Sequence, residues 1–169
     1  YEGNIKSRQQ INWKVRLWDE NDKAGEWSDP AYFEMGLLDI SDFEAKWINP
    51  EIDMDAKIES QEHKPAAYLI KEFIARDDVF SNGGRGRLYI TCHGIYVAYL
   101  NGKRVGDFVL APATGTYDKK LAYQTYDVTE LIKAGKNELL VSIGNGWYRS
   151  CTGVDGDRNL FGTDISLYC

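Results

Sequence analysis

Residues 144–149 have the sequence Gly-Asn-Gly-Trp-Tyr-Arg and follow an apolar run. Trp and Tyr rings can cover the apolar C–H face of a sugar, while Asn and Arg side chains can bond its hydroxyl groups. This combination predicts a carbohydrate-binding site made of Asn145, Trp147, Tyr148 and Arg149. The alternative is structural, with Trp147 and Tyr148 filling the end of a sandwich or packing against a neighbouring domain.

Carboxylate side chains are numerous, and a glycosidase needs two of them facing each other across the bond that it breaks. Nearly all of those in this chain fall in polar turns, where aspartate is favoured for local hydrogen bonding and stays solvated. The sequence therefore predicts no catalytic residue. The acidic residues considered are Asp19, Glu20, Asp22, Asp39, Asp42, Asp53, Asp55, Asp77, Asp78, Asp155 and Asp157.

Histidine and cysteine are scarce and widely spaced. The two histidines, His63 and His93, lie far apart in sequence, and no Cys/His spacing suits zinc, so no metal ligand is predicted. The three cysteines, Cys92, Cys151 and Cys169, form no close pair and do not suggest a disulfide framework. Their pattern favours a reducing compartment, and we expect a cytoplasmic location.

Composition limits the classes of partner. The 169 residues are 43% hydrophobic and 13% aromatic, enough to bury a real core in one domain or two small ones. The formal charge is −6 and the basic residues are scattered, which argues against nucleic acid. No apolar stretch approaches the roughly 18 residues of a membrane span, so we expect no membrane partner. No leader peptide is recognised.

A strand is predicted at residues 11–18 because apolar and polar residues alternate there, and a second strand is predicted at residues 31–35, after Pro30. Two strands cannot bury a sheet face by themselves. We therefore expect residues 1–38 to be the closing strands of a module. The positions of Trp13 and Trp27 around the polar turn resemble the end of a fibronectin type III-like or immunoglobulin-like module.

Residues 39–169 are predicted to form a second domain, an all-β, jelly-roll-like antiparallel β-sandwich, because short strands alternate with glycine-rich turns. Asn101 and Gly102 tolerate the positive φ angles of a tight hairpin turn. Residues 51–65 are expected to form a mobile loop. Strands are predicted at residues 68–74, 87–93, 95–100, 104–110, 122–126, 138–143 and 164–168.

A short helical turn is predicted at residues 128–133, between two of these strands. Asp127 offers an N-cap carboxylate for its first turn, and Gly135 is expected to end it. Capping therefore accounts for Asp127 and Thr129 without any functional role.

Taken together, these elements resemble the N-terminal region of bacterial α-L-rhamnosidases of glycoside hydrolase family 78. Residues 11–38 resemble the preceding fibronectin-like module of the same enzymes, so the resemblance covers nearly the whole chain. The family usually has glycine where this chain has Ser150. The matching motifs are residues 45–48 (Ala-Lys-Trp-Ile), 69–73 (Leu-Ile-Lys-Glu-Phe), 87–96, the Asn101-Gly102 hairpin, 110–112 (Leu-Ala-Pro), 123–129 and 144–149.

The resemblance implies a non-catalytic fragment that acts as a structural and sugar-binding module. The full-length enzyme would hydrolyse terminal α-L-rhamnose from glycosides, with inversion expected from the family. In the resembled enzymes the catalytic acid and base lie in a downstream (α/α)6 barrel. That barrel of the same chain, together with an L-rhamnose-containing glycoside, is the expected partner.

Some rhamnose-binding modules of this family use a calcium ion, which takes six to eight oxygen ligands. Conceivable oxygen donors here lack the closing Glu of an EF-hand, and no cofactor or ligand set is assigned to this chain. These donors are Asn101, Asp107, Asn145, Asp155 and Asp157.

Two alternatives remain open. The hairpin and the Asp-Val-Thr-Glu-Leu segment at residues 127–131 also occur in sugar-binding jelly-roll domains of family 2 β-galactosidases and β-glucuronidases. The second alternative is that the chain is an independent, lectin-like rhamnose-binding module. The motif at residues 144–149 favours the rhamnosidase hypothesis.

Overall fold

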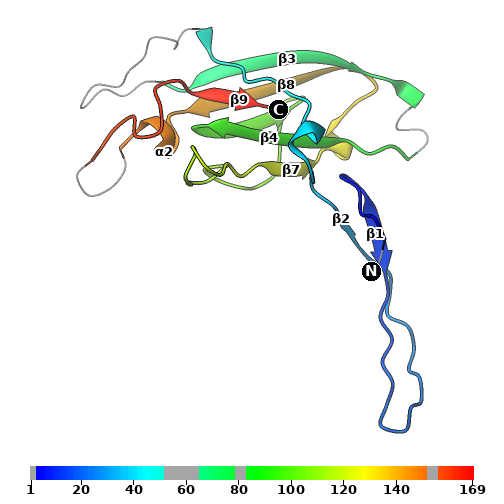
Figure 1. Cartoon of the computed structure of the whole chain (residues 1–169). Helices are drawn as coiled ribbons and strands as arrows, with labels where there is room; N and C mark the ends of the chain where they lie inside the picture. The colour runs from blue at the N-terminus through cyan, green and yellow to red at the C-terminus, as the bar shows by residue number, and fades with distance from the viewer. Residues whose placement is uncertain (1–2, 52–64, 79–82, 152–155) are drawn as a thin grey trace. The chain divides into compact units, whose positions relative to one another are not determined.

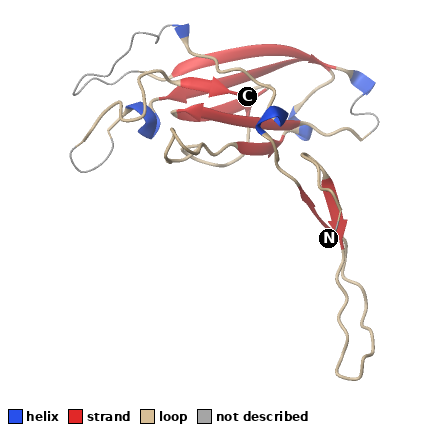
Figure 2. Cartoon of the chain, in the orientation of Figure 1, coloured by secondary structure: helices blue, strands red, loops and turns tan. Residues whose placement is uncertain are grey.

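The computed structural model describes residues 3–51, 65–78, 83–151 and 156–169. The chain divides into two compact units, Tyr1–Glu44 and Ala45–Cys169. Every strand pair among these described residues is antiparallel (Figures 1 and 2). Most of the loop predicted at residues 51–65 lies outside the described residues. In the part of the chain that is described, no helix is long and apolar enough to cross a membrane.

The first unit contains one antiparallel pair, β1 (Gln10–Trp13) with β2 (Ala31–Glu34). The strand predicted at residues 11–18 is therefore too long. Beyond β1 the Ser28 N–H donates to the Val15 carbonyl oxygen (2.8 Å), but the Val15 N–H donates to the Ser28 hydroxyl (3.0 Å) and not to a backbone carbonyl. The short helix η1 (Ile40–Asp42) follows β2.

Arg16 organises the tip of this hairpin. Its guanidinium carbon lies 4.9 Å from the Trp18 ring centroid and 4.8 Å from that of Trp27. A cation over an aromatic face is attracted by the negative charge of that face. The two tryptophans thus hold the arms of the hairpin together through Arg16.

The second unit is a sandwich of two sheets. One sheet has the order β3-β8-β5-β6, and the other has the order β7-β4-β9 (Figure 1). Inward residues of both sheets form one core, including Ile90 and Cys92 from one sheet and Val141 and Ile143 from the other. The predicted all-β antiparallel β-sandwich is confirmed. The strands are β3 (Ala67–Ala75), β4 (Arg87–His93), β5 (Ile95–Leu100), β6 (Lys103–Arg104), β7 (Gln124–Asp127), β8 (Gly135–Gly144) and β9 (Ser166–Tyr168).

The Asn101-Gly102 hairpin forms as predicted, with φ angles of +52° and +77°. The strand predicted at residues 104–110 is wrong, because β6 ends at Arg104. Gly106 has a φ of +65°, and a Cβ there would lie 2.4 Å from a ring carbon of Tyr126. The backbone therefore leaves the extended conformation to pass beside that ring.

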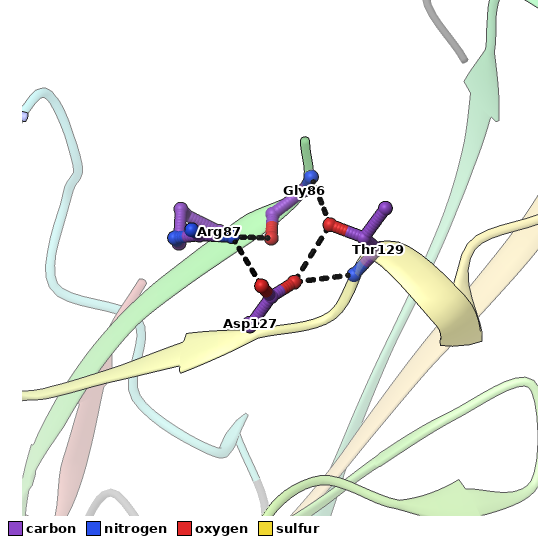
Figure 3. A network of polar contacts seen from close by, with 4 residues as sticks. All are labelled: Gly86, Arg87, Asp127 and Thr129. Atoms are coloured by element: carbon purple, nitrogen blue, oxygen red, sulfur yellow. Dashed lines mark hydrogen bonds and ion pairs between the residues drawn. The ribbon is translucent and has the colours of Figure 1, made fainter. Parts of the chain in front are cut away.

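A polar network joins the start of β4 to the end of β7 (Figure 3). Asp127 accepts from the backbone N–H of Thr129 (3.0 Å) and from its hydroxyl (2.6 Å). The prediction that Asp127 is an N-cap is wrong, because the N-cap of the short helix that follows is Val128, which has no side-chain capping bond. The Gly86 N–H donates to the Thr129 hydroxyl oxygen (2.9 Å), and Arg87 forms an ion pair with Asp127 (2.9 Å). Hydrogen bonds from Thr129, more than the charge of Arg87, lower the pKa of Asp127. The short helix η3 (Thr129–Leu131) begins here.

A buried amide ties the hairpin turn to β8. Asn137 is 1% exposed, and its Oδ1 accepts from the Lys133 N–H and the Asn101 amide, both at 2.8 Å. Its Nδ2 donates to the carbonyl oxygens of Lys133 (2.7 Å) and Gly135 (2.9 Å). The prediction that Gly135 ends the helical turn is wrong: η3 ends at Leu131, and Gly135 begins β8 with a φ of +80°.

We expect Asn137→Ala to lower the free energy of unfolding by about 2 kcal/mol, because partly buried backbone groups lose their partners. Urea unfolding followed by far-UV circular dichroism measures this. The matched control is Asn49→Ala, at an exposed asparagine of the same unit, which should leave the midpoint unchanged. Equal midpoints for the two variants would contradict a structural role for the Asn137 amide.

Candidate functional site

The predicted carbohydrate site lies where β8 gives way to the short helix α2 (Gly146–Arg149). Gly146 makes this turn with a φ of +51°, and a Cβ there would lie 2.6 Å from a side-chain carbon of Ile95. It would also lie 2.9 Å from the carbonyl carbon of Gly94. Only glycine therefore lets the chain turn this closely against the neighbouring strand.

Arg149 is completely buried, with 0% of its surface exposed. Its Nε and Nη2 donate to Asn145 Oδ1 at 3.0 and 2.6 Å, and its Nη1 donates to the Thr163 carbonyl oxygen at 2.9 Å. A buried cation must be compensated by such acceptors. Asn145 and Arg149, which the sequence predicts to bond a sugar, thus bond each other within the protein.

The segment before β9 is docked on α2 by its backbone. The Asn159 N–H donates to the Arg149 carbonyl oxygen (3.1 Å), and the Phe161 N–H donates to the Tyr148 carbonyl oxygen (3.4 Å). A Cβ on Gly162 would lie 2.2 Å from the Tyr148 hydroxyl oxygen. The Arg149 side chain also donates to the Thr163 carbonyl oxygen in this segment. Asn145 and Arg149 therefore help to hold the segment that leads into β9 against α2.

Tyr148 belongs to a cluster of stacked rings. Its ring is stacked parallel to the His93 ring, with 4.5 Å between the ring centroids. The His93 ring is also stacked with the Trp47 ring, with 4.1 Å between their centroids. Tyr117 meets Tyr148 edge-on at 5.3 Å. The stack therefore joins α2, β4 and the segment that enters the unit. Phe161 packs against Tyr117, and Tyr168 packs against Trp47.

These partners were not predicted from sequence. The alternation in residues 87–93 places His93 on the face opposite the buried Cys92, and that was the available signal. Nothing in the spacing shows that rings from four other segments cover this face. Trp147, the remaining predicted residue, lies on α2 with its surface partly exposed.

His93 is the titratable group of the stack. Its Nδ1 lies 3.0 Å from the Ser166 hydroxyl oxygen, and burial lowers the pKa of its imidazole. The neutral ring is thus preferred in the folded chain, where it stacks between Trp47 and Tyr148. A shallow pocket of about 230 Å³ adjoins the stack through Tyr117, lined mainly by residues 112–117 and 120–122. This pocket is smaller than the usual range for small-molecule sites, roughly 300–1,000 Å³.

Two of the conceivable calcium donors, Asn101 and Asn145, lie far apart. Asn101 follows β5 and Asn145 follows β8, and the pairing of Ile95 with Gly144 and of Leu100 with Leu139 puts them at opposite ends of the sheet. That separation is roughly 20 Å at 3.4 Å per residue. The oxygens of both amides also accept bonds from within the protein.

Asp155, another conceivable donor, lies outside the described residues. Among those described, no three His, Cys, Asp or Glu side chains gather at one place.

The lowered pKa of His93 predicts a pH-dependent stability. Because the folded pKa lies below the unfolded value of about 6.5, folding favours the neutral ring. Stability should be complete above the unfolded pKa and fall as the pH drops through the folded pKa. Urea midpoints measured from pH 8 down to pH 5 test this.

The matched pair of variants for this experiment is His93→Gln and His63→Gln. The decline between pH 7 and pH 5 should be smaller in His93→Gln and unchanged in His63→Gln. The same slope in both variants would contradict the assignment to His93.

The comparisons with known proteins agree on one family. The sequence model of the α-L-rhamnosidase N-terminal domain matches residues 83–169, and that of the Rha78A-like, N-terminal immunoglobulin domain matches residues 1–39. An α-L-rhamnosidase of Formosa agariphila is 40% identical over 152 residues, which are 88% of this chain and 16% of that protein. The chain thus spans about a sixth of the length of this relative.

Solved structures show the same relationship. The α-L-rhamnosidase of Aspergillus terreus superposes with a TM-score of 0.82 at 34% identity, over 96% of this chain and 18% of that one. The Streptomyces avermitilis α-L-rhamnosidase complexed with L-rhamnose shares the fold, with a TM-score of 0.81 at 19% identity, over 98% of this chain and 31% of that one. From its fold and its sequence together, the chain belongs to the α-L-rhamnosidase N-terminal domain family.

Proposed function

We propose that this chain is a non-catalytic module of a longer α-L-rhamnosidase that removes terminal α-L-rhamnose from glycosides. The observation that carries the proposal is that nearly the whole chain matches a small N-terminal share of rhamnosidases about six times its length. The bond-breaking residues then lie in another part of the same polypeptide, which we expect to be a helical (α/α)6 barrel. The module supports that catalytic part.

The placement of the carboxylates supports a non-catalytic role. A general acid in a glycosidase is held protonated by an apolar environment close to a second carboxylate. Among the described residues, the buried polar and charged side chains are Thr91, Asn137, Arg149 and Ser166, and none is acidic. The described carboxylates are therefore placed as solvated surface groups.

The outer face of β3 supports contact with the rest of the polypeptide. Tyr68, Ile70 and Ile74 are 65%, 61% and 80% exposed. The cross-strand partner of Ile70 on the same face is Leu140, which pairs in turn with Tyr99. The solvent face of an antiparallel sheet is normally polar, so an apolar row across three strands is typical of a covered face.

Carbohydrate binding is a second candidate function, favoured by the partly exposed Trp147, which precedes the stacked Tyr148 on α2. In this proposal Trp147 and Tyr148 supply the surface that contacts an L-rhamnose-containing glycoside. Asn145 and Arg149 hold the turn that presents them. The sugar would then contact the Trp147 and Tyr148 rings, and the buried Arg149 guanidinium would contribute by holding α2 in place.

Activity measurements test the non-catalytic role. We expect the purified chain to release no detectable p-nitrophenol from p-nitrophenyl α-L-rhamnoside, while a full-length rhamnosidase assayed in parallel does. Release that co-purifies with the chain through successive columns and persists at constant specific activity would contradict the proposal.

Calorimetric titration with L-rhamnose tests the carbohydrate role. Binding at millimolar sugar should be lost in Trp147→Ala and kept in Tyr68→Ala, which truncates an exposed aromatic ring on β3. Absence of heat in the unaltered chain would eliminate sugar binding and leave the supporting role. Equal binding by both variants would place the sugar away from Trp147.

A further inference from the structure

The loop between β6 and β7 holds a pocket that the proposed functions do not use. Its volume is about 230 Å³, and residues 112–117 and 120–122 line it. Tyr117 is 8% exposed and belongs to the wall of the pocket, and its ring meets the Tyr148 ring edge-on at 5.3 Å. The pocket therefore lies next to the candidate carbohydrate site on α2.

Hydrogen bonds from two strands hold this loop in place. At its start, the Tyr96 N–H of β5 donates to the Ala111 carbonyl oxygen (2.8 Å). At its end, the Thr91 hydroxyl of β4 donates to the Ala122 carbonyl oxygen (2.7 Å). Small-molecule sites are usually formed before the ligand arrives, and a loop anchored at both ends meets that requirement.

The backbone of the loop is strained at two positions. Leu110 and Ala113 have φ angles of +57° and +80°, which are uncommon for residues other than glycine. The Ala113 N–H donates to the Leu110 carbonyl oxygen (2.9 Å), and the Tyr117 hydroxyl donates to the Ala113 carbonyl oxygen (3.3 Å). Such strain persists only where surrounding contacts enforce it, and it is concentrated at functional sites. Two strained residues beside one pocket therefore favour a binding role over a simple surface depression.

The side chains of the wall combine the chemistry that a sugar requires. Tyr117 and Leu121 supply apolar surface, and Thr114 and Thr116 supply hydroxyl groups. Lys120 is the charged side chain among the described residues of the wall, and no carboxylate there balances it. The volume is small for a drug-sized ligand but suits one ring. A cavity of roughly 150 Å³ holds benzene, so this pocket admits a six-membered ring with several substituents.

We propose that this pocket binds one acidic sugar residue, a hexuronate, with its carboxylate at the Lys120 ammonium group. The Thr114 and Thr116 hydroxyls then bond the hydroxyl groups of the sugar, and Tyr117 contacts its C–H groups. The inference deepens the carbohydrate-binding candidate by adding a second sugar position and its chemical class. It rests on that candidate function in treating the module as one that contacts glycans.

An NMR titration of the isotope-labelled chain tests the charge requirement. The two probes are methyl β-D-glucuronide and methyl β-D-glucoside, which differ only in the carboxylate. We expect millimolar glucuronide to shift the backbone N–H signals of residues 113–122. Its dissociation constant should be about three- to fivefold lower than that of the glucoside, as expected for an exposed ion pair.

Lys120→Gln should remove this preference, so that the two probes bind equally. The matched control is Lys119→Gln, at the neighbouring lysine, which lies outside the wall of the pocket. The control should keep the preference. Equal effects of the two substitutions would overturn the proposal. So would the absence of shifts at millimolar glucuronide, or shifts confined to residues outside the loop.

Trp147→Ala separates this inference from the carbohydrate site on α2. Glucuronide binding that is unchanged in Trp147→Ala supports a separate pocket, even where the unaltered chain gives no heat with L-rhamnose. Loss of glucuronide binding in Trp147→Ala would place the acidic sugar on α2 and overturn the inference.

Discussion

The buried Arg149 guanidinium is the interaction on which one end of the sandwich depends. The Asn145 amide oxygen and the Thr163 carbonyl oxygen accept its N–H groups. Breaking the hydrogen bonds of a buried cation costs free energy, so the bonds of the Arg149 guanidinium hold α2 and the segment before β9 in one arrangement. The rings of Tyr148 and His93 can stack in parallel because α2 is held in place.

The opposite end of the sandwich is fixed without a buried charge. There the Asn137 amide joins the hairpin turn to β8, and Asp127 and Thr129 join β7 to β4. Between the two ends the core is apolar and continuous. The unit thus combines an apolar core with polar ties at both ends.

Local patterns were enough to predict most of the sandwich, because strand alternation and turn chemistry are sequence-local. The Asn101-Gly102 turn and the strands β4 and β5 follow directly from them. The strand predicted after Lys103 failed because contact with the Tyr126 ring, a tertiary event, bends the chain at Gly106. The motif at residues 144–149 spans the end of β8 and α2, but its spacing does not reveal whether Arg149 faces solvent or the interior. Its partner Thr163 and the stacked His93 are distant in sequence and carry no local signal.

A double-mutant cycle between Asn145 and Arg149 is the most direct measurement of the central claim. Unfolding free energies of Asn145→Ala, Arg149→Met and the double variant give the coupling between the two side chains. Because charge-assisted hydrogen bonds join them inside the fold, we predict a coupling of at least about 1 kcal/mol. Effects that add to within about 0.3 kcal/mol would show that the two side chains act independently, and the account of α2 as an anchored turn would then be wrong.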